Sequence, residues 1–191
     1  MRRLMQTLLF FLTGISLIAI AACTPPPDTG ISSYAEDRAL IEDLQARYMF
    51  AFDFNDFDKY VSLFTEDGIV DIVGMKWQGH KELREMLEGM GKKDPKNEPK
   101  PVAKKEKELY PATGRHNITN IVLKIDGDRA TGRAYWFNFG NRNPERKAVL
   151  SSYGHYEDEM VKVNGQWLFS KRLIYNEQYE EWIGPAENPC W

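Results

Sequence analysis

Hydrophobic side chains follow a helical spacing between residues 35 and 90 of the chain. Over residues 35–53 they recur every three or four positions, which lines them up on one face of a helix. This row consists of Ile41, Leu44, Tyr48 and Phe52, flanked by Leu40 and Ala51. Asn55 or Asp56 can cap a second, short helix, whose buried row is Phe57, Tyr60, Val61 and Phe64. A short strand over residues 68–73 and a third amphipathic helix over residues 79–90 are predicted next.

The second half of the chain has the alternating pattern of long strands. Two hairpins are predicted, and each has a glycine-containing turn at its centre. They comprise residues 117–125 with 129–139, and residues 149–163 with 166–175. Helices first and antiparallel strands later predict an α+β domain. Because long aromatic-rich strands curl, we expect a curved antiparallel sheet packed against three N-terminal helices, with a ligand pocket enclosed between them.

The first 23 residues have the features of a lipoprotein signal peptide. A positively charged start precedes an apolar run over residues 4–22, which ends in small residues followed by Cys23. This ending resembles the bacterial lipobox, in which the cysteine becomes lipid-modified after cleavage. Thr24 at the next position indicates the outer membrane, so we expect a lipid anchor on Cys23 and a location facing the periplasm. The alternative is an uncleaved membrane anchor, because the run just reaches the roughly 20 residues that span a bilayer.

The rest of the chain divides into three parts. Residues 24–33 are rich in proline and predict an extended tether, residues 34–180 predict one domain, and residues 181–191 form a C-terminal tail. Within the domain, residues 92–108 combine many lysines with three prolines and almost no apolar side chains. This composition predicts a solvated loop. A lid, or a patch that touches anionic lipid headgroups, is the alternative for this loop.

Charge and motifs narrow the classes of partner. The formal net charge is -3 and the isoelectric point is near 5.7, so no general attraction to nucleic acid is expected. The sequence has no P-loop, no GxGxxG fingerprint and no HExxH motif. Its three histidines lie far apart without zinc-ligand spacing, and His80 and His155 are expected on the surface. We therefore expect no metal, no organic cofactor and no nucleic acid partner.

Asp53 and His116 are the candidate catalytic pair. Asp53 ends the first predicted helix and His116 lies where the first long strand begins, so both can face one cavity. A carboxylate that holds one imidazole nitrogen selects a tautomer and leaves the other nitrogen free to take a proton. Such a pair is a general base. The alternatives are a helix-terminal cap for Asp53 and a hydrogen-bonded, non-catalytic His116 in a pocket wall.

Three blocks of sequence have an order and turn positions that are specific to one family. They are ALIEDLQARYMFAFDFNDFDKYVSLFTEDGIVDI, RHNITNIVLKIDGDRATGRAYWF and HYEDEMVKVNGQWLFSKRLIY. Together they resemble a SnoaL-like domain of the nuclear transport factor 2 superfamily. The resemblance implies a cone-shaped fold and a homodimer formed through the exposed sheet face. The branch similar to scytalone dehydratase has an Asp in the first helix and a His at the start of the long strand pair, and Asp53 and His116 match these positions.

The chain departs from that branch at several positions. Phe52 stands where dehydratases often have Tyr, and Gly140 and Tyr156 lie near the places of a second His and an Asn in scytalone dehydratase. We therefore do not expect this chain to share the substrate of scytalone dehydratase. We expect Tyr156 to act as a catalytic group that supports a developing oxyanion. Tyr48, Phe52 and Trp136 are expected to line the substrate pocket, and a core position is the alternative for Tyr48 and Trp136.

Two functional hypotheses follow for this chain. The first is a lipid-anchored lyase (dehydratase-like) or isomerase that uses the Asp53–His116 pair on a small apolar molecule without a cofactor. The second is a non-catalytic ligand-binding or protein-interaction module of the cell envelope, because folds of this family host both kinds of function. The sequence does not separate elimination from isomerisation.

Overall fold

The structure is a computed structural model and describes residues 31–91 and 113–178. These residues form helices α1 (Ile31–Asp53), α2 (Phe57–Ser62) and α3 (Gly79–Gly91), and strands β1 (Phe64–Ile72), β2 (Met75–Gln78), β3 (Gly114–Asp126), β4 (Arg129–Gly140), β5 (Val149–Val163) and β6 (Gln166–Asn176). Because α1 begins at Ile31, helix replaces the last part of the predicted tether. The predicted signal peptide, the lysine-rich loop of residues 92–108 and the tail of residues 181–191 lie outside the described residues.

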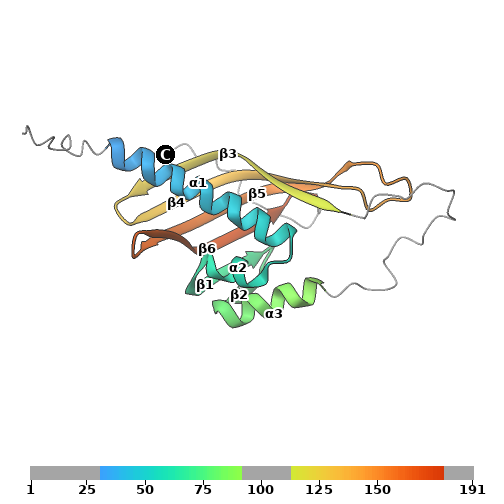
Figure 1. Cartoon of the computed structure of the whole chain (residues 1–191), viewed down its shortest axis with the longest axis horizontal. Helices are drawn as coiled ribbons and strands as arrows, with labels where there is room; N and C mark the ends of the chain where they lie inside the picture. Colours follow the sequence, from blue (N-terminus) through green and yellow to red (C-terminus); the bar gives the residue numbers. More distant parts are fainter. Residues whose placement is uncertain (1–30, 92–112, 179–191) are drawn as a thin grey trace, which may run out of the picture.

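The strands form one curved sheet in the order β2-β1-β6-β5-β4-β3. Figure 1 shows α1 lying along the sheet, while α2 and α3 gather beside β1 and β2. The predicted α+β class, with helices packed against a curved sheet, is confirmed. One correction applies, because β1 and β6 run parallel whereas the other neighbouring strands are antiparallel.

Helix α1 buries the predicted row of side chains against the sheet. Ile41 and Leu44 are fully buried, Tyr48 and Ala51 nearly so, and Phe52 at the helix end is partly buried. The predicted contact of Leu40 is wrong, because this side chain is exposed. In the last turn of α1, Ala51 still lies in the core, Phe52 packs against its edge and Asp53 is partly buried.

Strand β1 differs most from the prediction. It begins at Phe64 rather than at Gly68, and α2 ends at Ser62. The pairing with β6 is irregular between Phe64 and Ile69, so buried and exposed side chains do not alternate regularly there. The sequence pattern therefore did not indicate a strand at this point. Gly68 lies in this irregularity, where a Cβ atom would be 2.9 Å from the Cβ of Phe64. Strand β2 was not predicted, because it is short and its side chains are mostly exposed.

A buried ion pair occupies the centre of the core. The Nε and Nη2 atoms of Arg172 donate to the two carboxylate oxygens of Asp158 at 2.8 and 2.7 Å, and both side chains are fully buried. The guanidinium carbon lies 4.1 to 4.2 Å from the ring centroids of Tyr48, Tyr156 and Phe169. Burial alone would lower the pKa of Arg172, but the Asp158 carboxylate outweighs it and raises that pKa. Arg172 therefore stays charged inside an aromatic core.

Candidate active site

The end of α1 places Asp53 at the edge of the core. Asn55 adopts a left-handed conformation (φ 56°), its amide donates to the carbonyl of Phe52 at 3.2 Å, and the amide of Asp56 donates to the carbonyl of Ala51 at 2.9 Å. These two bonds form a Schellman motif, which stops the helix and turns the chain. Asp56 then caps α2, since its Oδ1 accepts from the amide of Lys59 at 3.0 Å. Asp53 is thereby held in the last turn of α1.

Asp53 contacts His116 through both carboxylate oxygens. Oδ1 lies 2.6 Å from Nδ1 of the His116 ring, and Oδ2 accepts from the backbone amide of His116 at 2.9 Å. The two side chains are mostly buried, with 6% of Asp53 and 19% of His116 exposed. A carboxylate only accepts hydrogen bonds, so the short contact requires a proton on Nδ1. In a neutral ring this leaves Nε2 without a proton.

The position of Asp53 is unfavourable for helix stability alone. A carboxylate in the last turn of a helix faces the negative end of the helix dipole, and α1 has no basic residue in that turn to offset it. The two hydrogen bonds from His116 provide the compensation. Positions that break a local rule and are compensated by a distant partner are concentrated at functional sites.

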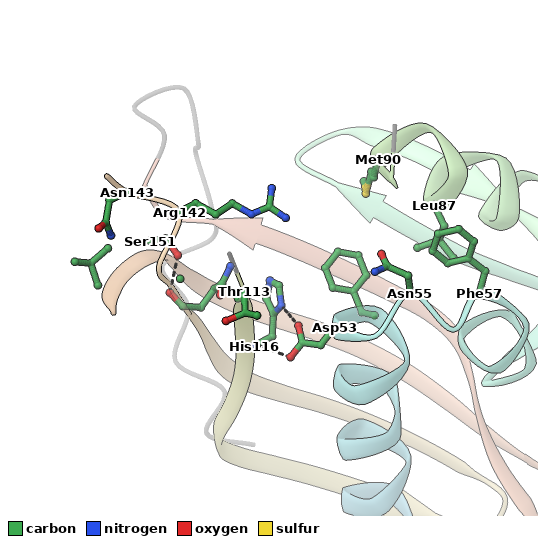
Figure 2. Close-up of a pocket in the computed structure, with 15 residues that line it drawn as sticks. Asp53, Asn55, Phe57, Leu87, Met90, Thr113, His116, Arg142, Asn143 and Ser151 are labelled. Atoms are coloured by element: carbon green, nitrogen blue, oxygen red, sulfur yellow. Dashed lines mark hydrogen bonds and ion pairs between the residues drawn. The ribbon is translucent and has the colours of Figure 1, made fainter. Parts of the chain in front are cut away.

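A pocket of about 450 Å³ opens beside this pair. Figure 2 shows Asp53 and His116 at its base, with the apolar side chains Phe57, Leu87 and Met90 on one side and Arg142, Asn143 and Ser151 on the other. The lining residues are Phe52, Asp53, Asn55, Phe57, Leu87, Met90, Thr113, Gly114, His116, Asn138, Gly140, Arg142, Asn143, Val149 and Ser151. The pocket is thus divided into an apolar half supplied mainly by α1, α2 and α3 and a polar half supplied mainly by β3, β4 and the loop after β4.

Among the other predicted pocket residues, only Phe52 lines this pocket. Its ring lies edge-on to His116 with the centroids 5.0 Å apart. Trp136 lies one layer deeper, 6.2 Å from the His116 ring, and its indole N–H donates to the carbonyl of Tyr175. Tyr48 is buried in the core, where its hydroxyl accepts from that of Tyr60 at 3.1 Å. Trp136 and Tyr48 are therefore core residues, which was the alternative to the predicted pocket role.

Tyr156 does not reach this pocket, which corrects the prediction of a catalytic role. It is paired with Ala134, whereas Ser152 on the same strand is paired with Asn138 near His116. The ring therefore lies deeper in the sheet, 3% exposed, and stacks on Trp136 and Arg172. Burial raises the pKa of the Tyr156 hydroxyl well above its ordinary value. The phenol supports the core instead of a ligand in this pocket.

Five polar residues that line the pocket were not predicted from the sequence, namely Thr113, Asn138, Arg142, Asn143 and Ser151. Asn138 is directly opposite His116 in the ladder of β3 and β4, so the two side chains share a face. The buried Oδ1 atom of Asn138 has no hydrogen-bond partner within the described residues. Ser151 reaches the pocket through a pairing irregularity between β4 and β5, and its hydroxyl donates to the carbonyl of Asn138 at 3.0 Å.

The other two histidines lie away from this pocket. Nε2 of His80 is 3.1 Å from the carbonyl of Phe64, and Nδ1 of His155 is 2.8 Å from a carboxylate oxygen of Glu177. Both are partly buried rather than fully on the surface. In the described parts of the chain, no group of three His, Cys, Asp or Glu side chains is arranged to hold a metal ion. Nor does any helix of residues 31–91 and 113–178 have the length and apolar character to cross a membrane.

Comparisons with known proteins agree with this architecture. A protein of unknown function from Mycobacterium tuberculosis is similar at 24% identity, with 79% of this chain and 78% of that chain covered and a TM-score of 0.65. A protein proposed to be a scytalone dehydratase, from Novosphingobium aromaticivorans, is similar at 23% identity, with coverage of 84% and 97% and a TM-score of 0.61. A Nostoc punctiforme protein of unknown function with a cystatin-like fold is similar at 23% identity, with coverage of 75% and 92% and a TM-score of 0.59.

These structural similarities support the fold. The family is identified by the match of the sequence to a family model. No significant match was found among curated proteins. The family described as the SnoaL-like domain matches residues 33–173, which include both Asp53 and His116 and nearly all of the described core. The chain therefore belongs to the SnoaL-like domain family.

Proposed function

We propose that the protein is a cofactor-independent lyase, dehydratase-like, or an isomerase, in which Asp53 and His116 act together as a general base. The observation that carries the proposal is the 2.6 Å contact between Asp53 Oδ1 and His116 Nδ1 at the base of a pocket. Nε2 of His116 makes no hydrogen bond with the described residues, and the ring lines the pocket. A free, unprotonated Nε2 facing a cavity is the arrangement that proton abstraction requires.

The proposed reaction begins with transfer of a proton from a substrate carbon to Nε2 of His116. The carbon must be acidified by a neighbouring carbonyl group, onto which the electron pair moves. Asp53 stabilises the imidazolium that forms, through the same contact that holds the neutral ring. In an elimination, the electron pair returns to break a C–O bond and the proton leaves with the hydroxyl group as water. In an isomerisation, the proton returns to a different carbon of the same molecule.

The pocket limits the substrate to a small molecule. A volume of about 450 Å³ lies in the lower part of the range for ligand sites. Phe52, Phe57 and Leu87 provide an apolar wall beside His116. Apolar surroundings strengthen the electrostatic interaction between the imidazolium and Asp53. The likeness to a protein proposed to be a scytalone dehydratase supports the lyase class.

A screen in heavy water tests this proposal. Small β-hydroxy carbonyl compounds and enolisable carbonyl compounds are incubated with the protein, and proton NMR follows both loss of water and incorporation of deuterium at the acidic carbon. We expect His116→Gln to abolish any such reaction. Turnover that survives in this variant would refute the general-base role. Ligand binding without turnover, unchanged when Asp53 and His116 are both replaced, would favour a binding module.

We also propose that Cys23 carries a lipid anchor that holds the domain at the outer membrane, facing the periplasm. The small residues before Cys23 and the proline-rich segment after it support this location. Expression of Cys23→Ser in a bacterial host is expected to abolish incorporation of a labelled fatty acid and to change processing of the first 23 residues. The same labelling in both proteins, or none in either, would contradict lipidation at this cysteine.

A further inference from the structure

The charges that line the pocket are not balanced. Asp53 is the acidic residue of the lining, and both of its carboxylate oxygens already accept hydrogen bonds from His116. Arg142 also lines the pocket, and within residues 31–91 and 113–178 it takes part in no hydrogen bond, ion pair or ring contact. Figure 2 shows its side chain extending from the loop after β4 across the space beside His116. Arg142 is thus a permanent, exposed cation that lines the cavity and has no ion-pair partner among the described residues.

The loop that carries Arg142 is held on both sides of it. On one side, Asn141 donates its amide to the carbonyl of Thr113 at 3.1 Å, and its side-chain oxygen accepts from the amide of Thr113 at 2.7 Å. On the other side, the side chain of Asn143 bonds both the amide and the carbonyl of Lys147, at 3.0 and 2.6 Å. The backbone of Arg142 is therefore fixed before any ligand binds, which reduces the entropic cost of binding.

Of the neighbouring cations, Lys147 and Arg115 are engaged elsewhere, and Arg146, which has a buried Nη1 atom without a partner in the described residues, does not line the pocket. Lys147 pairs with Glu145 at 3.0 Å. The guanidinium of Arg115 lies 4.6 Å from the ring centroid of Phe54 and donates to the carbonyl of Gly114. Neither Lys147 nor Arg115 lines the pocket. Arg142 is distinguished from these residues both by its position and by its lack of a partner in the described structure.

Asn138 supplies a second unsatisfied group on the same side of the pocket. Its Oδ1 atom is buried without a hydrogen-bond partner in the described residues, next to Gly114 and opposite His116. A buried polar atom without a partner costs about 1–3 kcal/mol, so a rotation of the amide that brings this atom to a ligand donor recovers that free energy. The amide accepts a hydrogen bond from a ligand hydroxyl, or donates one to a ligand oxygen if it is turned over.

We propose that the ligand of this pocket is a small carboxylic acid with an apolar body, and that Arg142 binds its carboxylate. Arg142 presents two parallel N–H donors that match the two oxygens of a carboxylate. The apolar body lies against Phe57, Leu87 and Met90, on the opposite side of the cavity. This inference rests on the proposed function, since it defines the substrate class of the same site. It also modifies the expectation of a small apolar molecule by adding a charged group.

Pairs of matched acids and amides test the proposal on the full chain. The probes are phenylacetate, cinnamate and phenylbutyrate, each compared with its primary amide, which has the same shape and no charge. Binding is followed by NMR of the Met90 methyl group and the His116 ring, both of which line the pocket. We expect each acid that binds to do so about tenfold more tightly than its amide, as a charged hydrogen bond provides.

Two arginine variants separate the site from general electrostatics. Arg142→Met is expected to remove the preference for acids while leaving binding of the amides nearly unchanged. Arg129→Met makes the same change of charge at the other end of β4, next to the turn, and is expected to keep the preference. Equal binding of acid and amide by the native protein, a preference that survives in Arg142→Met, or no acid binding at tens of millimolar would each overturn the proposal.

This binding experiment can fail independently of the proposed general-base function. Because the readout is binding, it does not depend on turnover. Acid binding that depends on Arg142, in a protein that catalyses neither elimination nor isomerisation, would leave this inference standing and remove the general-base proposal. Turnover of neutral substrates with no preference for acids would leave the general-base proposal standing and remove the inference about Arg142.

Discussion

Replacement of Asp53 by Asn is expected to lower turnover by about 100- to 10,000-fold, the range that general base catalysis contributes. The oxygen of the amide can keep the hydrogen bond from the backbone amide of His116, which Asp53 Oδ2 accepts at 2.9 Å. Its NH2 group then faces Nδ1 of the ring, where the native carboxylate lies 2.6 Å away. An NH2 group donates, so it favours the tautomer with the proton on Nε2, which is unable to take a proton from substrate. Steady-state kinetics on a substrate from the heavy-water screen measures the loss.

A nearby aspartate provides the matched control for this variant. Asp56 is exposed, caps α2 through Lys59 and does not line the pocket. Asp56→Asn makes the same change of charge and keeps a good capping residue, so its turnover is expected to remain native. If the two residues of the pair act as a unit, Asp53→Asn combined with His116→Gln loses little more than His116→Gln alone. Equal turnover of Asp53→Asn and Asp56→Asn would remove Asp53 from the mechanism.

Replacement of Arg172 by Met is expected to have the largest effect on stability, lowering the free energy of unfolding by about 3–5 kcal/mol. The change removes the partner of Asp158 while the carboxylate stays fully buried, and among the described residues Gln45 at 3.4 Å is then its remaining side-chain partner. It also removes the cation that lies against the rings of Tyr48, Tyr156 and Phe169. Urea unfolding followed by tryptophan fluorescence measures the change.

The adjacent residue on β6 separates this effect from a general loss of charge. Lys171 is partly exposed and lies 3.6 Å from Glu159, so Lys171→Met is expected to cost at most about 1 kcal/mol. Arg172→Met combined with Asp158→Leu removes both buried charges and is expected to recover much of the lost stability. If Arg172→Met is no less stable than Lys171→Met, the buried ion pair does not support the core as described.

The positions of Asp53 and His116 could be predicted because each depends on a local pattern. The apolar row of α1 identifies the helix and its end, and the Asn55-Asp56 dipeptide indicates both a stop and a new cap. His116 follows from the hairpin that is centred on Gly127. Two residues placed by strong local signals were therefore expected to meet, and the structure has them in contact at 2.6 Å.

The polar half of the pocket could not be predicted in the same way. Counting pairs outward from the turn between Asp126 and Arg129 would put Phe139 opposite His116. A register shift between Thr119 and Val122, where Asn120 has φ 54°, puts Asn138 there instead. A shift by one residue exchanges the two faces of a strand, so a single bulge decides which side chain enters the pocket.

Arg142 and Tyr156 illustrate two further limits of the sequence. Arg142 is one charged residue in a loop, with no periodic pattern to mark it, and its role depends on the two asparagines that hold the loop. Tyr156 lies on the buried face of β5. The position of Tyr156 along the sheet depends on how β3, β4, β5 and β6 pair. Their pairing places the Tyr156 ring beside Arg172 instead of His116.

The tautomer of His116 decides whether Asp53 and His116 can act together as a general base. Proton–nitrogen correlation NMR of the histidine rings at alkaline pH distinguishes a protonated nitrogen from a bare one, and the chain has three histidines to assign. Because Asp53 accepts from Nδ1, we predict a protonated Nδ1 and a bare Nε2 in His116, and an altered pattern in Asp53→Asn but not in Asp56→Asn. A proton on Nε2 of the native protein, or an average of both tautomers that Asp53→Asn leaves unchanged, would contradict it.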